Sequence, residues 1–271
     1  MARRMARGGR KTGKAVATKL SIRGAGKRYD RLDALKDCSF EVEDRTIVSI
    51  VGPSGCGKTT LLWSMSGLHG LTSGSVLLDG TAVTAPRPEI GLVFQEANLL
   101  PWRDLMSNIL FPNEIKRTAP DRAWIDHLLD RVGLKGFENR MPKQLSGGMQ
   151  QRAAIVRALA LRPQVLLMDE PFGALDAFTR EEMNRLVEEI WMETKTTIVF
   201  ITHSIEEAIF LSDRVIVLTR RPGRVLSDYA VPFDRPRTHD IMASKEVFDL
   251  TNRIKADIYG QTPVRTGAAA A

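Results

Sequence analysis

The chain has 271 residues, 43% of them hydrophobic, and a formal net charge of +7. That is long and apolar enough to bury a sizeable core, so we expect one large α/β domain, with or without a subdomain. No apolar run reaches 18 residues and no apolar segment follows the basic N-terminus, which argues against a membrane span and a secretory signal. The two cysteines, Cys38 and Cys56, lack metal-ligand spacing and suit a reducing compartment.

The positive charge is concentrated at the N-terminus. Residues 1–28 contain ten Lys or Arg and no acid, so the remainder carries 29 basic against 32 acidic residues, or −3. We predict that residues 1–18 form a flexible basic arm with affinity for anionic surfaces, either lipid headgroups or nucleic acid. The alternative is a disordered leader without a partner.

Short strand-like runs follow between Lys19 and Asp79. They read LSIRG, CSFEVED and SVLLDG, are bounded by Gly and Asp, and predict an antiparallel β edge. Between them lies the apolar run TIVSIV, which is followed at 51–60 by VGPSGCGKTT and then by a helical pattern. The glycines of this turn let backbone N–H groups converge, and the next helix directs the positive end of its dipole at the same point.

This turn is the strongest motif in the chain. The spacing of Gly52, Gly57, Lys58 and Thr59 matches the P-loop, in which the backbone cradles phosphates, the lysine reaches the terminal ones and the hydroxyl binds Mg²⁺. The alternative is a Gly-rich turn that binds nothing. The candidate nucleotide-binding residues are Gly52, Pro53, Ser54, Gly55, Cys56, Gly57, Lys58, Thr59 and Thr60.

The pattern changes after Gln95. Helical spacing predicts a helical insert over about 96–158, and strand signals return in QVLLMDE, TTIVFITH and RVIVLTR, separated by helices such as 177–193. The predicted fold is α/β, a P-loop NTPase core with a parallel sheet, an antiparallel β edge and an inserted helical subdomain, over residues 19–235. Residues 236–271 are expected to form a C-terminal tail with a short helix near 245–258.

Two further stretches carry chemistry. QVLLMDE ends in Asp169 and Glu170, which places one carboxylate near a P-loop metal and the next where it can orient or deprotonate a water. LSGGMQQR at 145–152 predicts a second anion-binding helix N-terminus that lacks a lysine and a metal ligand. Such a nest cannot hold MgATP alone, so we expect it to complete a site built elsewhere. The alternative is an N-capped helix.

With LSGGMQQR added to the P-loop, the chain resembles the ATP-binding subunits of ABC transporters over roughly residues 19–235. The resemblance implies an ATP hydrolase with Mg²⁺ as cofactor, in which two copies form a head-to-tail dimer and each copy places Ser146, Gly147 and Gly148 over the ATP of the other. It further implies roles for single residues. These are Glu170 as catalytic carboxylate, Gln95 at the metal and the attacking water, Asp169 and Thr59 as metal ligands, His203 at the terminal phosphate, Asp176 at the dimer seam and Tyr29 on the adenine.

Within that family, FQEANLLPWRDLMSNI and RRPGRV resemble the importers of nitrate, sulfonates and taurine. This implies a peripheral subunit on the cytoplasmic face of the inner membrane that contacts a membrane-spanning permease through residues 97–109. An extracytoplasmic solute-binding protein would act indirectly. We expect Trp102 to be the anchor, because a large aromatic beside Pro and Arg in a loop is typical of protein interfaces; packing against the insert's own helices is the alternative.

Other interpretations of the sequence stay open. The same subgroup includes importers of thiamin-pyrimidine precursors. An ABC-type ATPase acting on nucleic acid or ribosomes would use the basic arm differently, but such relatives typically carry two cores or a long coiled coil, and this chain has one motif set and no sustained heptads. A P-loop kinase would have no need of LSGGMQQR.

Overall fold

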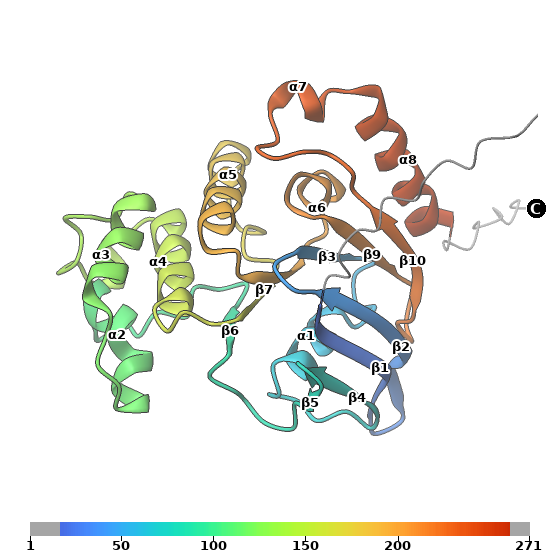
Figure 1. Ribbon diagram of the computed structural model, residues 1–271, viewed down its shortest axis with the longest axis horizontal. Helices are drawn as coiled ribbons and strands as arrows, with labels where there is room; N and C mark the ends of the chain where they lie inside the picture. Colours follow the sequence, from blue (N-terminus) through green and yellow to red (C-terminus); the bar gives the residue numbers. More distant parts are fainter. Residues whose placement is uncertain (1–16, 261–271) are drawn as a thin grey trace, which may run out of the picture.

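The computed structural model describes residues 17–260, which form two β-sheets, a group of helices inserted at one side and helices that cover the larger sheet (Figure 1). The smaller sheet is antiparallel, with the strand order β2-β1-β4-β5. Its strands are β1 (Thr18–Tyr29), β2 (Leu32–Glu43), β4 (Ser73–Leu78) and β5 (Thr81–Ala82). This is the antiparallel β edge that the sequence predicted.

The larger sheet has six strands in the order β10-β9-β3-β8-β7-β6. All neighbours are parallel except β10 and β9. Every residue of β3, β7 and β8 is buried, which explains why these strands read as continuous apolar runs rather than as alternating ones. The strands are β3 (Ile47–Val51), β6 (Ile90–Val93), β7 (Val165–Asp169), β8 (Thr197–Ile201), β9 (Arg214–Leu218) and β10 (Val225–Ala230).

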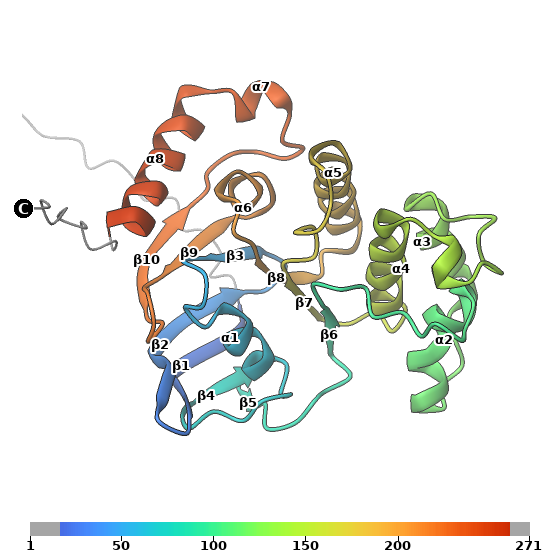
Figure 2. The ribbon, with the colours of Figure 1, turned by 180° about the vertical axis from the view of Figure 1, so that it is seen from behind.

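Helices pack on both faces of the six-stranded sheet. Helix α1 (Lys58–Met65) lies between the two sheets, where Leu61 and Leu62 join a core with residues of both (Figure 2). Helices α5 (Ala177–Thr194) and α6 (Ile205–Leu211) cover the other face. Alternate residues of β3 therefore enter different cores, with Ile50 facing α1 and Ile47 facing α5.

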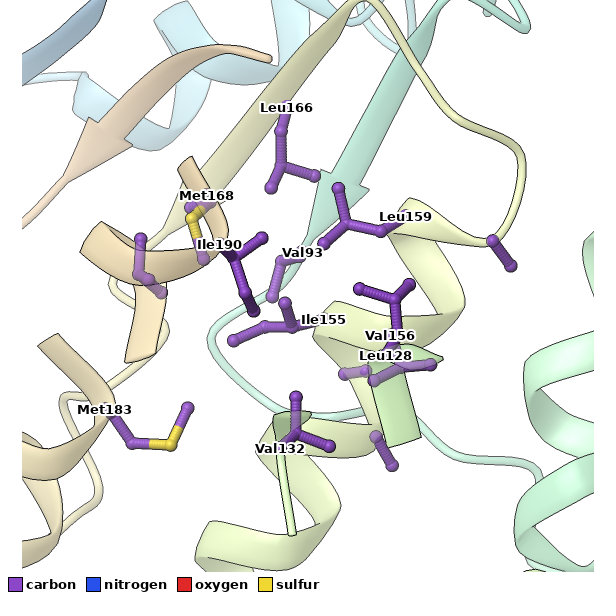
Figure 3. Packing of buried hydrophobic residues seen from close by; sticks show 14 of the residues in the cluster. Val93, Leu128, Val132, Ile155, Val156, Leu159, Leu166, Met168, Met183 and Ile190 are labelled. Atoms are coloured by element: carbon purple, nitrogen blue, oxygen red, sulfur yellow. The ribbon is translucent and has the colours of Figure 1, made fainter. Parts of the chain in front are cut away.

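The inserted helices are α2 (Leu105–Lys116), α3 (Arg122–Arg131) and α4 (Gly147–Leu159), with the short 3₁₀ helix η1 (Pro142–Gln144) before α4. Their apolar faces form one cluster with β6, β7 and α5, and Figure 3 shows Ile155 and Leu159 of α4 meeting Val93 of β6 and Leu166 of β7. The insert is thus fixed to the edge of the main sheet through α4.

The two ends differ from the sequence expectations. Strand β1 begins at Thr18, and the carbonyl oxygen of Ala17 accepts a hydrogen bond of 2.7 Å from the Asp44 N–H, so the basic arm ends before residue 17. The rest of the arm, 1–16, and the terminal residues 261–271 lie outside the described residues.

At the other end, α7 (His239–Met242) and α8 (Lys245–Gly260) pack on the core instead of trailing from it. Val247, Leu250 and Ile254 of α8 share a cluster with Ile205 and Ala208 of α6. The side chain of Arg237, which is buried, donates to three carbonyl oxygens at the end of α6. The short helix expected near 245–258 is therefore α8, and it belongs to the packed core rather than to a tail. Among residues 17–260, no helix is long and apolar enough to cross a membrane.

Candidate nucleotide-binding and hydrolytic site

The sheet order brings the predicted site residues to one edge. Strands β3, β8, β7 and β6 are consecutive neighbours and parallel, so their carboxyl ends lie side by side. The P-loop follows β3, His203 follows β8, and Gln95 follows β6. Asp169 is the last residue of β7, and Glu170 comes directly after it. Ligands of open α/β sheets bind at this edge.

The P-loop ends in an uncapped helix. Gly57 precedes α1 with φ of 104°, in the left-handed region, and no side chain caps the helix N-terminus. A Cβ at Gly57 would lie 2.9 Å from the carbonyl oxygen of Ala34, so the turn requires glycine for both conformation and space. The first backbone N–H groups of α1 therefore have no side-chain acceptor, and an anion is the partner they favour.

Lys58 lies in the wall of this turn and is only 6% exposed. Its Nζ donates to the carbonyl oxygens of Gly52 at 3.1 Å and Pro53 at 3.4 Å, and lies 3.8 Å from Oε1 of Glu170. A buried ammonium ion needs anionic or carbonyl partners, and these hold it at the phosphate cradle. The P-loop and the acidic pair after β7 therefore meet at Lys58.

A cavity of about 410 Å³ opens over the P-loop. Its lining comprises Tyr29, Leu32, Ala34, Ser54, Gly55, Gly57, Lys58, Thr59, Thr60, Glu170 and Arg221. Tyr29, which is 38% exposed, thus lies at the cavity, where its ring is available to a base. Its hydroxyl lies 2.8 Å from Nδ1 of His69, a histidine for which the sequence predicted no function. Tyr29 and His69 are 40 positions apart, so no local sequence pattern indicates their contact.

A larger hollow, of about 700 Å³, lies between α5, α6 and residues 236–242. Met192, Phe210 and Met242 line it, together with charged residues of α5. None of the predicted site residues is among its lining. The smaller cavity over the P-loop is therefore the one that predicted nucleotide-binding residues line.

Asp169 and Thr59 form the part of the site that suits a divalent cation. The Thr59 hydroxyl donates to Oδ1 of Asp169 at 3.1 Å, and Asp169 is 5% exposed. Burial raises the pKa of the Asp169 carboxyl, and the hydrogen bond from Thr59 only partly opposes this. Within residues 17–260, no three His, Cys, Asp or Glu side chains gather as a metal cage. Oxygen ligands of this kind fit Mg²⁺, which keeps several waters and is bound through one or two protein groups plus phosphates.

The residues predicted to take part in hydrolysis, Glu170, His203 and Gln95, lie around Gly173. Oε2 of Glu170 lies 3.3 Å from Nδ1 of His203. A Cβ at Gly173 would lie 3.8 Å from both Nε2 of Gln95 and Cε1 of His203. Glu170, His203 and Gln95 therefore surround Gly173, although only Glu170 also lines the cavity. Glu170 adopts φ of 42°, an uncommon conformation for a non-glycine residue that is typical of functional sites.

The other two motifs lie elsewhere on the chain. Ser146 accepts a hydrogen bond from the Met149 N–H at 3.2 Å and caps α4, and Asp176 caps α5 by accepting from the N–H groups of Phe178 and Thr179. Neither residue lines the P-loop cavity. The N-cap predicted as the alternative for LSGGMQQR is therefore present at Ser146, and Asp176 is an N-cap as well. A Cβ at Gly148 would lie 3.0 Å from Cγ2 of Thr179, so the start of α4 borders the start of α5.

The segment 97–109 is only partly at the surface. Leu105, Asn108 and Ile109 are fully buried, whereas Trp102 is 72% exposed, so most of the Trp102 side chain lies in solvent rather than in the core of the insert. Arg103 is not free to serve as a neighbouring anchor, since its Nη1 contacts Oε2 of Glu114 at 2.7 Å.

Two side chains that the sequence did not single out hold this loop. Asn108 accepts from the Leu100 N–H at 2.7 Å and donates to the carbonyl oxygens of Leu100, Arg103 and Asp104. Arg157 of α4 donates to the carbonyl oxygens of Ala97 at 2.7 Å and Asn98 at 2.9 Å. Burial lowers the pKa of Arg157. No sequence signal marks such bonds, because they end on backbone atoms that every residue has.

Comparison with known proteins agrees with this geometry. The family model described as ABC transporter matches residues 35–173. The chain is 46% identical over 224 residues to the taurine import ATP-binding protein TauB of Roseobacter denitrificans, which covers 80% of this chain and 83% of that protein. It is 44% identical over 212 residues to the nitrate import ATP-binding protein NrtD of Synechococcus elongatus, covering 76% of this chain and 77% of that one.

Comparison with solved structures agrees with the fold described above. A dimeric, post-hydrolysis ATP-binding cassette bound to ADP and Pi superimposes with a TM-score of 0.70 at 32% identity and covers 79% of this chain and all of that one. The CbiO1 subunit from Clostridium perfringens, part of an ABC transporter complex, gives a TM-score of 0.72 at 27% identity and covers 87% and 95%. With the P-loop, the acidic pair and the LSGGMQQR helix in one fold, the chain belongs to the ABC transporter family and is an ATP-binding cassette of that family.

Proposed function

We propose that the chain is the ATP-hydrolysing subunit of an importer of a small solute, bound peripherally at the cytoplasmic face of the inner membrane. The observation that carries the proposal is the meeting of the P-loop, Glu170 and His203 at adjacent strand ends while a second anion nest lies outside that cavity. The relatives named above are import ATP-binding proteins, which favours import over an action on nucleic acid or ribosomes.

The P-loop cavity binds ATP through groups already oriented for it. The uncapped N-terminus of α1 and Lys58 hold the phosphates, and the ring of Tyr29 stacks on the adenine. His69 contacts the Tyr29 hydroxyl and restricts the ring, so binding of a base costs less side-chain conformational entropy.

Thr59, Asp169 and Gln95 would hold Mg²⁺, which neutralises phosphate charge when it is bound. The chain's contribution is to keep these oxygen groups near Lys58, because Asp169 and Thr59 are already paired. A buried carboxylate whose pKa is raised is stabilised in its charged form by a cation, so this pair also gains from the ion.

Glu170 supplies the carboxylate for hydrolysis. It lines the cavity and contacts both Lys58 and His203, so it can accept a proton from a water aligned with the terminal phosphate. His203 contacts the other oxygen of this carboxylate, and we propose that it contacts the terminal phosphate when ATP is bound. Gln95 lies in the same group around Gly173.

A second copy of the chain completes the site. Ser146, Gly147 and Gly148 begin α4, lack a cation of their own and lie outside the P-loop cavity, so they serve a nucleotide held by a partner. Asp176 lies beside them as the N-cap of α5, and Phe178 in the first turn of that helix is 84% exposed. An exposed aromatic ring beside the N-terminus of α4 favours a protein–protein interface at this surface.

Helix α4 connects this proposed dimer interface to the predicted permease contact. Its first turn is the nest, Gln151 donates to the carbonyl oxygen of Phe94 at 3.1 Å, and Arg157 holds Ala97 and Asn98. A movement of α4 toward the partner's nucleotide therefore moves the loop that presents Trp102. We infer that Trp102 and the exposed part of 97–109 contact a cytoplasmic segment of the permease.

The solute is recognised by other subunits. An extracytoplasmic solute-binding protein and the permease make that contact. The relatives, named for taurine and nitrate import, support a small anionic or zwitterionic solute, and a sulfonate is a further candidate from the sequence resemblance. A thiamin-pyrimidine precursor is another solute of the same subgroup that the assay below would reveal.

The experiment is reconstitution of the full chain with the permease and binding protein encoded beside its gene. Uptake of labelled taurine, nitrate, an alkyl sulfonate and a thiamin-pyrimidine precursor is measured in vesicles with MgATP on the side of the chain. We expect uptake of one of these solutes that requires ATP and is lost with Lys58→Ala. Uptake that proceeds without ATP, or equally well with Lys58→Ala, contradicts the proposal.

A further inference from the structure

The turn between β9 and β10, residues 219–224, reaches the P-loop from another part of the chain. Thr219 closes the turn, since its N–H donates to the carbonyl oxygen of Arg224 at 2.9 Å and its hydroxyl accepts from the Arg224 N–H at 3.0 Å. The turn is also fixed to β2, because the Gly223 N–H donates to the carbonyl oxygen of Ala34 at 2.9 Å and the Lys36 N–H donates to that of Gly223 at 2.9 Å.

This turn packs directly on the phosphate cradle. A Cβ at Gly223 would collide with the carbonyl oxygen of Cys56, so glycine is needed for the two backbones to approach. A Cβ at Gly55 would lie 4.0 Å from Nη2 of Arg221. The guanidinium group of Arg221 therefore lies over the P-loop glycine, and Arg221 lines the same cavity as Lys58 and Tyr29.

The two cations of the cavity differ in their partners. Lys58 is buried and contacts two carbonyl oxygens and Glu170. The side chain of Arg221 is exposed and forms no hydrogen bond or ion pair with another residue in the described range 17–260. Its five N–H donors are available, and their planar arrangement suits phosphate oxygens.

We propose that Arg221 is a nucleotide-binding residue whose guanidinium group binds the phosphate chain of the nucleotide as a second cation beside Lys58. The proposal rests on the proposed function, because it requires a nucleotide in the P-loop cavity. A triphosphate carries more negative charge than Lys58 neutralises, and a rigidly held turn delivers Arg221 with little loss of backbone entropy. The exposure of Arg221 limits the gain through solvent screening.

The test measures the dissociation constants of ATP, ADP and GTP for the purified full chain by displacement of a fluorescent nucleotide. Arg221→Ala is compared with Arg221→Lys and with Arg224→Ala, a matched control in the same turn that does not line the cavity. We expect Arg221→Ala to weaken ATP, ADP and GTP by a similar factor of roughly five to tenfold, the range of a partly screened charge-assisted hydrogen bond. Arg221→Lys should recover part of that loss and Arg224→Ala should bind like wild type.

Three results would overturn the inference. They are nucleotide affinity of Arg221→Ala within twofold of wild type, an equal loss in Arg224→Ala, and a loss for ATP that GTP does not share, which would place the contact on the base. Lys58→Ala separates this from the proposed function. If Lys58→Ala loses nucleotide and Arg221→Ala does not, only the role of Arg221 is wrong. If Lys58→Ala binds normally, the assignment of the cavity itself is wrong.

Discussion

Substitution of Trp102 by alanine separates a role in coupling from a role in folding. The side chain is 72% exposed, so about a quarter of it is covered. A tryptophan buries at most about 250 Å², so the covered part is roughly 70 Å², worth at most about 1.7 kcal/mol at about 25 cal/mol per Å². For a chain of this size the melting temperature should fall by no more than about 3–6 °C.

A buried tryptophan gives the contrast. Trp191 of α5 is 7% exposed, and Trp191→Ala should cost about 3–5 kcal/mol and lower the melting temperature by about 6–20 °C. Trp102→Ala should therefore stay folded, keep the nucleotide affinity and basal ATPase rate of the isolated chain, and lose assembly with the permease or uptake per ATP hydrolysed.

The assay is thermal melting, ATPase rate and reconstituted uptake on the same preparation. A fall in melting temperature as large as that of Trp191→Ala, with all activities lost in proportion, would refute the exposure argument. Normal assembly and normal uptake would show that the permease contact lies on another surface.

Three further predictions use other parts of the chain. Lys58→Ala should weaken ATP binding severely, because the phosphate charge loses its buried partner, and unchanged affinity in a titration would contradict the P-loop assignment. Deletion of residues 1–16 should leave ATPase activity intact but reduce salt-sensitive binding to anionic vesicles, as six Lys or Arg are removed at about 1 kcal/mol each; vesicle binding that ignores both salt and the deletion argues for a leader without a partner. Burial raises the pKa of Cys38 to about 11, so between pH 9 and 11 the unfolded chain releases a proton that the folded chain keeps, and stability falls as the pH rises. Urea unfolding should show the stability advantage of wild type over Cys38→Ala shrinking by about 2 kcal/mol over that range, and a constant difference would contradict the shift.

The sequence predicted the parts of the site that lie next to each other in the chain. Gly57, Lys58 and Thr59 are consecutive where the P-loop enters α1, and Asp169 and Glu170 are consecutive where β7 ends, so spacing alone indicated their chemistry. Their assembly follows from the parallel order of β3, β8 and β7, which places the ends of these strands together.

Features that depend on distant pairs were not predictable. His69 holds Tyr29, Arg157 holds Ala97, and Arg221 reaches Gly55, each across a long stretch of sequence. The packing of α8 on α6 was missed for a related reason, since an amphipathic helix shows that it has a partner but not which one.

The extent of the segment 97–109 also needed the structure. Its apolar residues looked alike in sequence, yet Leu105 and Ile109 are core while Trp102 is in solvent. Asp104 marks the division, because its side chain caps α2 by accepting from the Ser107 N–H at 2.7 Å and everything after it belongs to the helix.

The most direct test of the account is sedimentation of Glu170→Gln with and without MgATP, paired with its ATPase rate. The amide keeps the shape of Glu170 and its place at the cavity but cannot accept a proton, so turnover should fall by about 10²-fold or more while ATP still binds. Two chains should then be held together by the unhydrolysed nucleotide, and the double variant with Lys58→Ala should remain a monomer. A Glu170→Gln chain that stays monomeric in MgATP and hydrolyses ATP at the wild-type rate would contradict the central claim.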